Sequence, residues 1–270
     1  MQPLTIVTVT YNSGGVIAHL LSSLPSPDIE LLVVDNGSSD GCQAIAATFA
    51  NVRVIQNGNI GYGRAANVGF REATTAYVLL MNPDVMISQE TIDQMLACMD
   101  ANPDIGILGG NLTGEPAEGL QDVVWIVGAL MLIRRDALAQ VGLFDEQIFL
   151  FYEESDLCQR FLKAGWRLAV LQSAVAGHEI GTSSPASLKV RRIKSWHFAW
   201  SKCYYYRKHY STSQYLRKCF TRVASSPFRM AVGLLSGNPR RAVDTGYELL
   251  GALAYLGGLS AFRNGVGRLT

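Results

Sequence analysis

The last third of the chain has almost no acidic residues. None occurs between Ile180 and Val243, and residues 180–270 contain 15 Lys and Arg against 2 Asp and Glu. Residues 1–179 contain 8 basic and 20 acidic side chains, so the overall net charge of +1 conceals two oppositely charged parts. Because the surface of a globular domain normally mixes both signs, the basic part predicts an anionic partner, either a membrane leaflet or a polyanion.

Cysteine is scarce and unpatterned. The five cysteines are odd in number and form no CxxC pair and no Cys/His cluster at metal spacing. This excludes a zinc-thiolate site and a disulfide framework, and it favours a reduced, cytosolic protein.

Long hydrophobic runs are also absent. No basic segment precedes the first apolar run, Leu4–Val9, which is too short for a signal peptide and predicts a strand. The longest near-apolar stretch, Leu249–Phe262, is too short and too rich in glycine to span a bilayer. With 49% hydrophobic and 17% charged residues, the 270-residue chain can bury one sizeable core.

The first hundred residues alternate between strand and helix patterns. Continuous apolar runs separated by helices predict a parallel sheet covered on both faces, in a doubly wound, Rossmann-like α/β fold. The expected strands are residues 4–10, 30–35, 52–56 and 77–81, and the expected helices are residues 16–24, 41–49, 65–73 and 90–99.

The pattern becomes less regular after Ile105–Leu108. We expect a polar loop over residues 115–122, entry of Trp125–Ile133 into the sheet, helices over residues 135–141 and 155–164, and a late strand over residues 167–171. From Leu188 onward the sequence predicts a helical, basic and aromatic extension with a break near Ser236–Pro239. The predicted domains are residues 1–185, with halves at roughly 1–110 and 111–185, and the extension 186–270.

Polar or glycine-rich segments follow all four early strands. In open α/β sheets, ligands bind beyond the carboxyl ends of the strands, so these segments should share one ligand-binding edge. Asp35 could accept a hydrogen bond from a base or a ribose, or it could cap the next helix. Asp84, behind Pro83, could bind Mg²⁺ or Mn²⁺, and the alternative is again a helix cap. The segments begin with Thr10, Asp35, Asn57 and Asn82.

Three carboxylates follow an apolar and aromatic run. Glu153, Glu154 and Asp156 come directly after Phe149–Tyr152. Apolar surroundings and acidic neighbours raise a carboxyl pKa, which suits a base that deprotonates a hydroxyl. The alternative is an acidic helix start that complements the helix dipole. His178, in a glycine-rich loop, is a candidate metal ligand or a structural histidine.

Taken together, these segments resemble family-2 glycosyltransferases of the GT-A fold, and in particular the bacterial rhamnosyltransferase-like branch that builds O-antigen and other surface polysaccharides. The similarity covers roughly residues 4–210, and the order and spacing of its motifs make it specific. The matching stretches are Val7–Asn12, Val33–Gly41, Asn59–Gly69, Leu80–Asp84, Gly128–Arg135, Gly142–Glu146, Tyr152–Arg160, His178 and Tyr206–Tyr210.

The resemblance implies a role for each matched residue. Glu154 occupies the position of the catalytic base, and Asp84 and His178 would hold a divalent metal, Mg²⁺ or Mn²⁺. Glu153, Asp156 and Arg160 would support the base or bind the acceptor. The nucleotide-sugar site would be formed by Thr10, Tyr11, Asn12, Asp35, Asn36, Gly61, Arg64, Asn67 and Asn82.

The sequence departs from the branch in two places. The branch usually has Glu-Asp where this chain has Glu153-Glu154, and the longer side chain changes where the base would sit. The segment Gly114–Val124, which would border the acceptor, is shorter than usual.

The implied activity is inverting, metal-dependent transfer of a sugar, rhamnose by analogy with the branch, from a nucleotide-diphosphate donor such as dTDP-rhamnose. The acceptor would be a polyprenyl-diphosphate-linked saccharide, and the enzyme would act as a peripheral protein on the inner face of the plasma membrane. The aromatic and basic residues of Trp196–Tyr210 would bind anionic lipid; a helix packed on the catalytic domain is the alternative. Single-stranded RNA could use the same chemistry, but we expect no nucleic-acid partner.

Three other functions remain open. The donor sugar could instead be galactose, N-acetylglucosamine or another deoxysugar. A nucleotidyltransferase is disfavoured because Tyr11–Gly15 lacks the cation that its phosphate loop needs. The substitution at Glu154 leaves room for a non-catalytic nucleotide- or sugar-binding relative.

Overall fold

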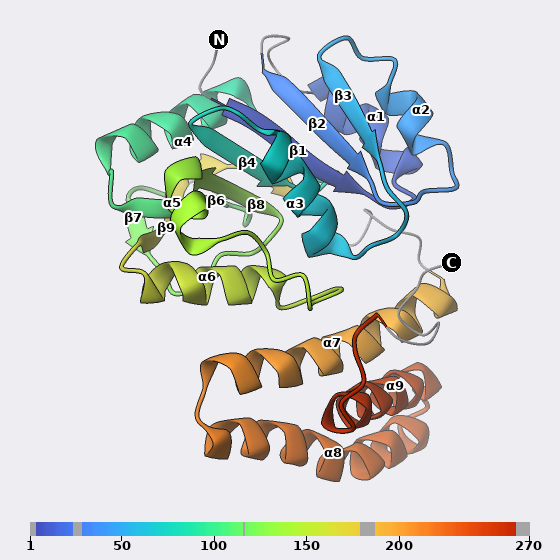
Figure 1. Ribbon diagram of the computed structural model, residues 1–270. Helices are drawn as coiled ribbons and strands as arrows, with labels where there is room; N and C mark the ends of the chain where they lie inside the picture. Colours follow the sequence, from blue (N-terminus) through green and yellow to red (C-terminus); the bar gives the residue numbers. More distant parts are fainter. Residues whose placement is uncertain (1–3, 24–28, 116, 179–186, 263–270) are drawn as a thin grey trace. The chain divides into compact units, whose positions relative to one another are not determined.

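The computed structural model describes residues 4–23, 29–115, 117–178 and 187–262, apart from the side chain of His178 (Figure 1). The chain divides into two compact units. The sheet unit consists of Met1–Phe144 and Glu154–Pro185, and the helical unit consists of Asp145–Glu153 and Ala186–Thr270.

The sheet unit contains an eight-stranded sheet in the order β3-β2-β1-β4-β8-β6-β9-β7. The pairs β1–β2, β2–β3, β1–β4 and β6–β9 are parallel, and β8 and β7 join in antiparallel fashion. This confirms the doubly wound, mostly parallel sheet. The strands are β1 (Leu4–Thr10), β2 (Glu30–Asp35), β3 (Val52–Gln56), β4 (Tyr77–Met81), β6 (Ile105–Asn111), β7 (Leu120–Asp122), β8 (Leu130–Arg134) and β9 (Arg167–Val175).

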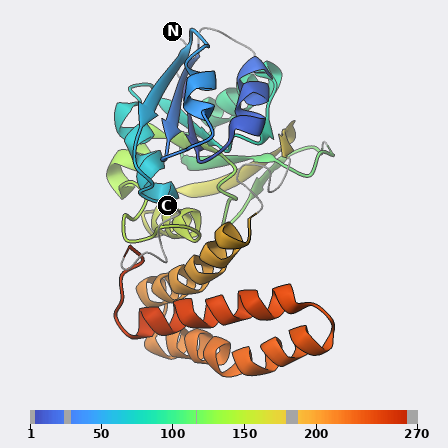
Figure 2. The same cartoon turned by 90° about the vertical axis from the view of Figure 1, so that its right-hand side faces the viewer.

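Alternate residues of each central strand enter opposite cores, which explains the continuous apolar runs. In β1, Leu4 and Ile6 join one core while Val7 and Val9 join the other. The first core is covered by α1 (Gly14–Ser23), α2 (Cys42–Ala46) and α4 (Gln89–Ala101). The second is covered by α3 (Tyr62–Glu72), α5 (Arg135–Val141) and α6 (Glu153–Lys163), so the sheet lies between two helical layers (Figure 2).

Three short strands fall outside the sequence-based expectations. The segment expected as a polar loop contains β7, which pairs with β9. A separate two-stranded sheet joins β5 (Val85–Met86) to β10 (Gly177–His178). The prediction that Trp125–Ile133 enters the sheet is wrong at its start, because only β8 pairs there and Trp125 lies in the preceding loop.

The helical unit contains α7 (Leu188–His209), α8 (Thr212–Leu235) and α9 (Pro239–Leu256). Side-chain caps begin all three: Ser187 for α7, Ser211 with Gln214 in a capping box for α8, and Asn238 before Pro239 for α9. Helices α7 and α9 approach so closely that a Cβ at Gly251 would lie 2.1 Å from the carbonyl oxygen of Trp196.

The aromatic residues of α7 fill the interior of the helical unit. Trp196, Trp200 and Tyr205 are buried, and Trp200 stacks on Tyr204 at a centroid distance of 5.4 Å. The expectation that the aromatic residues of Trp196–Tyr210 form a lipid-binding surface is therefore wrong for these buried rings. No helix in the described ranges is long and apolar enough to cross a lipid bilayer.

Candidate active site

The ends of β1 and β2 share a buried carboxylate. Thr10 pairs with Asp35 in the strand register, and Thr10 Oγ1 donates to Asp35 Oδ1 at 3.3 Å. The other carboxylate oxygen accepts the backbone amide of Ser38 at 3.3 Å. Helix α2 begins after Gly41 without a side-chain cap, so the alternative reading of Asp35 as a helix cap is wrong. Asp35, only 3% exposed, holds the strand ends together.

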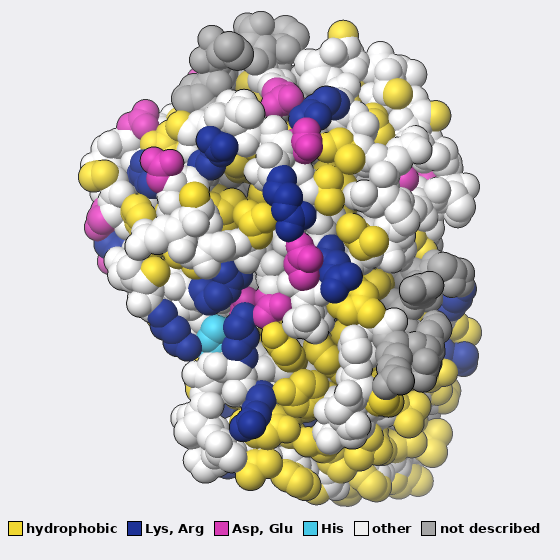
Figure 3. All heavy atoms as spheres, in the orientation of Figure 1, with side chains coloured by type: hydrophobic (Ala, Val, Ile, Leu, Met, Phe, Trp, Pro, Cys, Tyr) yellow, Lys and Arg dark blue, Asp and Glu magenta, His cyan; other side chains and the backbone are white. Residues whose placement is uncertain are grey.

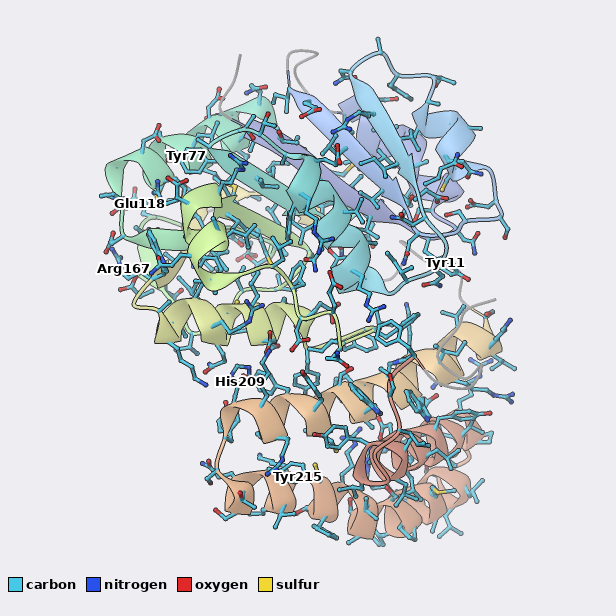
Figure 4. The ribbon with its side chains drawn as sticks, viewed as in Figure 1. Tyr11, Tyr77, Glu118, Arg167, His209 and Tyr215 are labelled. Atoms are coloured by element: carbon cyan, nitrogen blue, oxygen red, sulfur yellow. The ribbon has the colours of Figure 1, made fainter. Side chains whose placement is uncertain are left out.

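The loop after β1 is tied to the loop after β2. The amide of Asn12 donates to Ser38 Oγ at 2.9 Å, and Asn12 Oδ1 accepts the amide of Ser39 at 2.8 Å. Tyr11, labelled in Figure 4, is half-buried at the end of β1. Burial raises the pKa of its phenol, and a hydrogen bond with Asn59 partly opposes that rise.

The third loop joins the same network through Asn59. Asn36 Nδ2 and the amide of Gly61 both donate to Asn59 Oδ1 at 3.3 Å, while Asn36 Oδ1 accepts the amide of Ile60 at 3.0 Å. Gly61, at φ +91°, occupies a backbone conformation that favours glycine, and α3 begins behind it. Sequence reasoning did not single out Asn59, although it lies in the Asn57–Asn59 turn.

Helix α3 carries two predicted donor-site residues with different surroundings. Arg64 is half-buried in the first turn. Asn67 is buried, its Nδ2 donates to the carbonyl of Phe144 and its Oδ1 accepts the amide of Phe144, both at 2.9 Å. Because both ends of the amide hold this backbone, Asn67 has a structural role, and its contact with the donor stays a prediction.

Asn82, Pro83 and Asp84 form a closed turn after β4. The amide of Val85 donates to the carbonyl of Asn82 at 3.1 Å. Asn82 itself donates its amide to the carbonyl of Ala129 at 2.9 Å, and its Oδ1 accepts from the hydroxyl of Tyr62 at 3.2 Å. Asp84 is buried in the turn that leads into β5 and lies at no helix start, so the helix-cap alternative is wrong here too.

The main chain of His178 lies beside this turn. His178 pairs with Val85 between β10 and β5, which brings its backbone next to the residue that follows Asp84. The side chain of His178 lies outside the described residues. Among the residues that the structure does describe, no group of three His, Cys, Asp or Glu side chains could hold a metal ion.

Glu154 has the environment of a carboxyl with a raised pKa. Burial is the main cause of the rise, and hydrogen bonds from its own amide, Ser155 and Trp125 partly oppose it. Ser155 Oγ donates to Glu154 Oε1 at 3.1 Å. One turn later, burial and the charge of Glu154 raise the pKa of Cys158 to about 12. Nothing in the sequence indicated the hydrogen bond from Trp125, because it depends on loop geometry.

The backbone just before the carboxylates is strained. Phe151 and Tyr152 adopt φ angles of 66° and 69°, a left-handed conformation that is rare for bulky side chains. Tyr152 packs against Phe198 and Tyr205 at centroid distances of 5.6 and 5.3 Å, within the helical unit. Such strain costs about 1–3 kcal/mol per residue and occurs preferentially at functional sites.

Two of the supporting residues brace the fold. Arg160 Nε donates to Asp156 Oδ2 at 2.8 Å, and its remaining nitrogens donate to the carbonyls of residues 141–143 at 2.7–3.0 Å. Asp156 is fully buried. These bonds tie α6 to residues 141–143, which favours a supporting role for Arg160, and acceptor binding stays untested. Glu153, also buried, is the first residue of α6.

One short segment borders both the Asn82–Asp84 turn and Glu154. The carbonyl of Ala129 holds the amide of Asn82, and a Cβ placed on Gly128 would lie 3.4 Å from the Cβ of Glu154. The hydroxyl of Tyr62 also lies 3.4 Å from the carbonyl of Gly128. Residues 128–129 therefore lie between the Asn82–Asp84 turn and the start of α6 at Glu154.

The sequence of the chain is similar to those of known proteins. The sequence model described as Glycosyl transferase family 2 matches residues 5–143, just over half of the chain, and Glycosyl transferase family group 2 matches residues 112–259. The N-acetylglucosaminyl-diphospho-decaprenol L-rhamnosyltransferase of Mycobacterium tuberculosis is 30% identical over 71% of this chain and 82% of its own length. Rhamnosyltransferase WbbL of Escherichia coli is 26% identical over 64% and 82%.

Solved structures share the fold. The mannosyltransferase PcManGT from Pyrobaculum calidifontis, in complex with GDP-Man and Mn²⁺, superimposes with a TM-score of 0.62 at 17% identity, over 94% of this chain and 87% of that one. TarS 1–349 of Staphylococcus aureus, in complex with UDP-GlcNAc, gives 0.56 at 19% identity, over 95% and 92%. The fold is thus GT-A, and the family match shows that the chain belongs to glycosyl transferase family 2 and is a glycosyltransferase.

Proposed function

We propose that the chain is an inverting rhamnosyltransferase that uses a nucleotide-diphosphate donor and a polyprenyl-diphosphate-linked saccharide acceptor in the synthesis of O-antigen or another surface polysaccharide. The observation that carries the proposal is Glu154, a half-buried residue whose carboxyl has a raised pKa, beside the segment that also holds the Asn82–Asp84 turn. The choice of rhamnose and of the lipid-linked acceptor is supported by the names of two relatives.

The nucleotide would bind at the network that joins the ends of β1, β2 and β3. Asp35 and Asn36 are fixed there by hydrogen bonds from neighbouring loops, so a base or ribose would meet groups that are already oriented. Thr10, Tyr11 and Asn12 would line the same pocket, and Arg64 would supply a positive charge near the diphosphate.

A divalent metal fits the residues at the Asn82–Asp84 turn. Asp84 offers a carboxylate, and the backbone of His178 runs alongside the turn. Mg²⁺ and Mn²⁺ are commonly held by one or two protein ligands together with substrate phosphates, so a cluster of three protein ligands is not required. When bound, the ion would offset the negative charge that develops on the diphosphate leaving group.

Glu154 would act as the general base. Its carboxylate would accept the proton of the acceptor hydroxyl while the hydroxyl oxygen bonds to the anomeric carbon. The bond from that carbon to the diphosphate would break in the same step, and its electron pair would leave on the diphosphate. Attack opposite the leaving group inverts the configuration, and a raised pKa makes the carboxylate a stronger base.

A donor screen with the purified chain tests the proposal. With a polyprenyl-diphosphate N-acetylglucosamine acceptor, we expect dTDP-rhamnose to give product and UDP-galactose and UDP-N-acetylglucosamine to give little. NMR of the new anomeric centre would show inversion. Preference for another donor would overturn the rhamnose assignment, and donor hydrolysis without transfer would overturn the proposed acceptor chemistry.

A further inference from the structure

The outward side of α8 has the opposite composition to that of an ordinary surface helix. A helix on the surface of a globular protein presents charged and polar residues to solvent. Between Cys219 and Leu235, none of the exposed positions of α8 is charged and one, Thr221, is polar. The exposed residues in this interval are Phe220, Thr221, Ala224, Pro227, Phe228, Ala231, Leu234 and Leu235.

These side chains form one continuous stripe, which we call the α8 face. Positions 220, 224, 228, 231 and 235 recur every three to four residues, so they lie on one side of the helix. The three largest members, Phe220, Phe228 and Leu235, are 56%, 73% and 89% exposed. Helix α9 has exposed hydrophobic side chains of its own at Val243, Leu250 and Leu253. Hydrophobic side chains gather over the helical unit in the lower part of Figure 3.

Positive charges flank the α8 face at both ends. Arg217 and Lys218 precede it, Arg240 and Arg241 follow it at the start of α9, and all four are exposed. The two acidic residues of α9, Asp244 and Glu248, do not offset these positive charges, because both form ion pairs with other arginines. Asp244 pairs with Arg191, and Glu248 lies 2.6 and 3.1 Å from Arg222 and Arg229.

We propose that the α8 face docks on an anionic lipid bilayer, with α8 lying in the plane of the interface. Apolar residues flanked by Arg and Lys are the composition of helices that bury one face among acyl chains while cations meet anionic headgroups. A soluble polyanion would attract the cations but would leave the phenylalanines in water. A second copy of the chain would bring the same cations together, which opposes pairing through this face.

The test measures binding of the full chain to vesicles by sedimentation. Vesicles of phosphatidylcholine mixed with phosphatidylglycerol should bind the protein at low salt, and vesicles of phosphatidylcholine alone should bind it more weakly. The double variant Phe220→Gln/Phe228→Gln keeps the net charge. It should lower partitioning of the protein into the vesicles by at least about tenfold, because two apolar rings can no longer be buried in the bilayer. Arg240→Gln/Arg241→Gln should lower it by about tenfold at low salt and less at high salt.

Leu188→Gln is the matched control. Leu188 is 62% exposed in the same unit but begins α7, outside the α8 face, so its replacement should leave partitioning nearly unchanged. Circular dichroism should show that all variants keep their helix content, since the replaced side chains are exposed. The assay contains no donor or acceptor, so its result is independent of glycosyl transfer.

Three results would overturn the proposal. The first is no binding of the wild type to anionic vesicles at low salt. The second is a phenylalanine variant that binds as well as the wild type, or a Leu188→Gln control that loses as much binding. The third is a wild-type dimer, detected by light scattering, that the phenylalanine substitutions dissociate, which would assign the α8 face to a second copy of the chain.

Discussion

The hydroxyl of Tyr62 donates a hydrogen bond to the side-chain oxygen of Asn82 across 3.2 Å. Tyr62 begins α3 directly behind Gly61, and Asn82 opens the turn that contains Asp84. This bond connects the glycine loop beside the nucleotide network to the turn proposed to hold the metal. It therefore joins two parts of the proposed donor site that are twenty residues apart in the sequence.

Removing this hydroxyl should weaken use of the donor. For Tyr62→Phe we expect kcat/KM for the donor to fall about fivefold, since a hydrogen bond contributes about 1 kcal/mol. Tyr77→Phe is the control. Tyr77 lies opposite Leu4 at the other end of the sheet, and its hydroxyl bonds Asp100 at 2.6 Å, so its loss should affect stability without affecting the donor. Equal losses in kcat/KM would refute the connection.

Glu154→Gln should abolish transfer while leaving donor binding intact. The amide cannot accept the proton of the acceptor hydroxyl, so we expect turnover to fall by about two orders of magnitude or more. Calorimetry should give a donor Kd close to that of the wild type. Glu90→Gln, an exposed change on α4, should leave both quantities unchanged. A parallel loss of donor binding and turnover in Glu154→Gln would argue against its role as the base.

The pH dependence of transfer should report the raised pKa of Glu154. The base works when deprotonated, so the rate should be low at acid pH and rise as the pH passes through a pKa above the ordinary glutamate value. The hydrogen bond from Ser155 lowers this pKa, so Ser155→Ala should move the rising limb to higher pH. If the rising limb of the pH–rate profile has the same midpoint in Ser155→Ala as in the wild type, a group other than Glu154 controls the rate.

Asp156→Asn should destabilise the protein without changing substrate affinity. The ion pair of Asp156 with Arg160 is largely buried, and breaking such a pair costs about 3–5 kcal/mol. Asp104→Asn, which breaks an exposed pair with Arg167, should destabilise the protein far less, because solvent screens the pair. Denaturant unfolding measures both. A raised acceptor KM in the folded Asp156→Asn protein would instead restore the acceptor-binding role.

Removal of divalent metal should stop transfer. We expect EDTA to abolish activity and Mn²⁺ or Mg²⁺ to restore it, while Asp84→Asn should raise the metal concentration needed for half-maximal activity by about tenfold. Asp93→Asn, an exposed change on α4, is the control. Full activity in the presence of chelator would exclude Asp84 from metal binding.

The central strands β1, β2 and β4 could be predicted closely because they are buried on both faces, and the edge strand β3 has β-branched residues at three of its five positions. The expected bounds of residues 4–10, 30–35, 52–56 and 77–81 are those of β1 to β4. Each strand ends at a polar residue or is followed directly by one, so the sequence alone marks where it stops. Strands β5, β7 and β10 were missed because two or three residues show no periodicity, and such strands depend on their tertiary partners.

The sequence predicted which residues belong to the candidate site, but not which contacts each of them makes. Glu154 and the turn at Asp84 follow from local patterns. The engagement of Asn67 with Phe144 and of Arg160 with residues 141–143 depends on contacts between distant segments. Likewise, composition indicated a basic, aromatic extension, but only the packing of α7 shows that Trp196 and Trp200 face its interior.

Gly69 allows α3 to pack directly on β1. A Cβ at this position would lie 2.4 Å from Cγ1 of Val7, so α3 rests directly on β1 with no room for a side chain. This close approach packs the helix that carries Arg64 tightly against the strand that ends at Thr10. If the nucleotide binds at these strand ends as proposed, we expect it to meet a surface that is already formed, so that discrimination among nucleotides arises from fit to that surface.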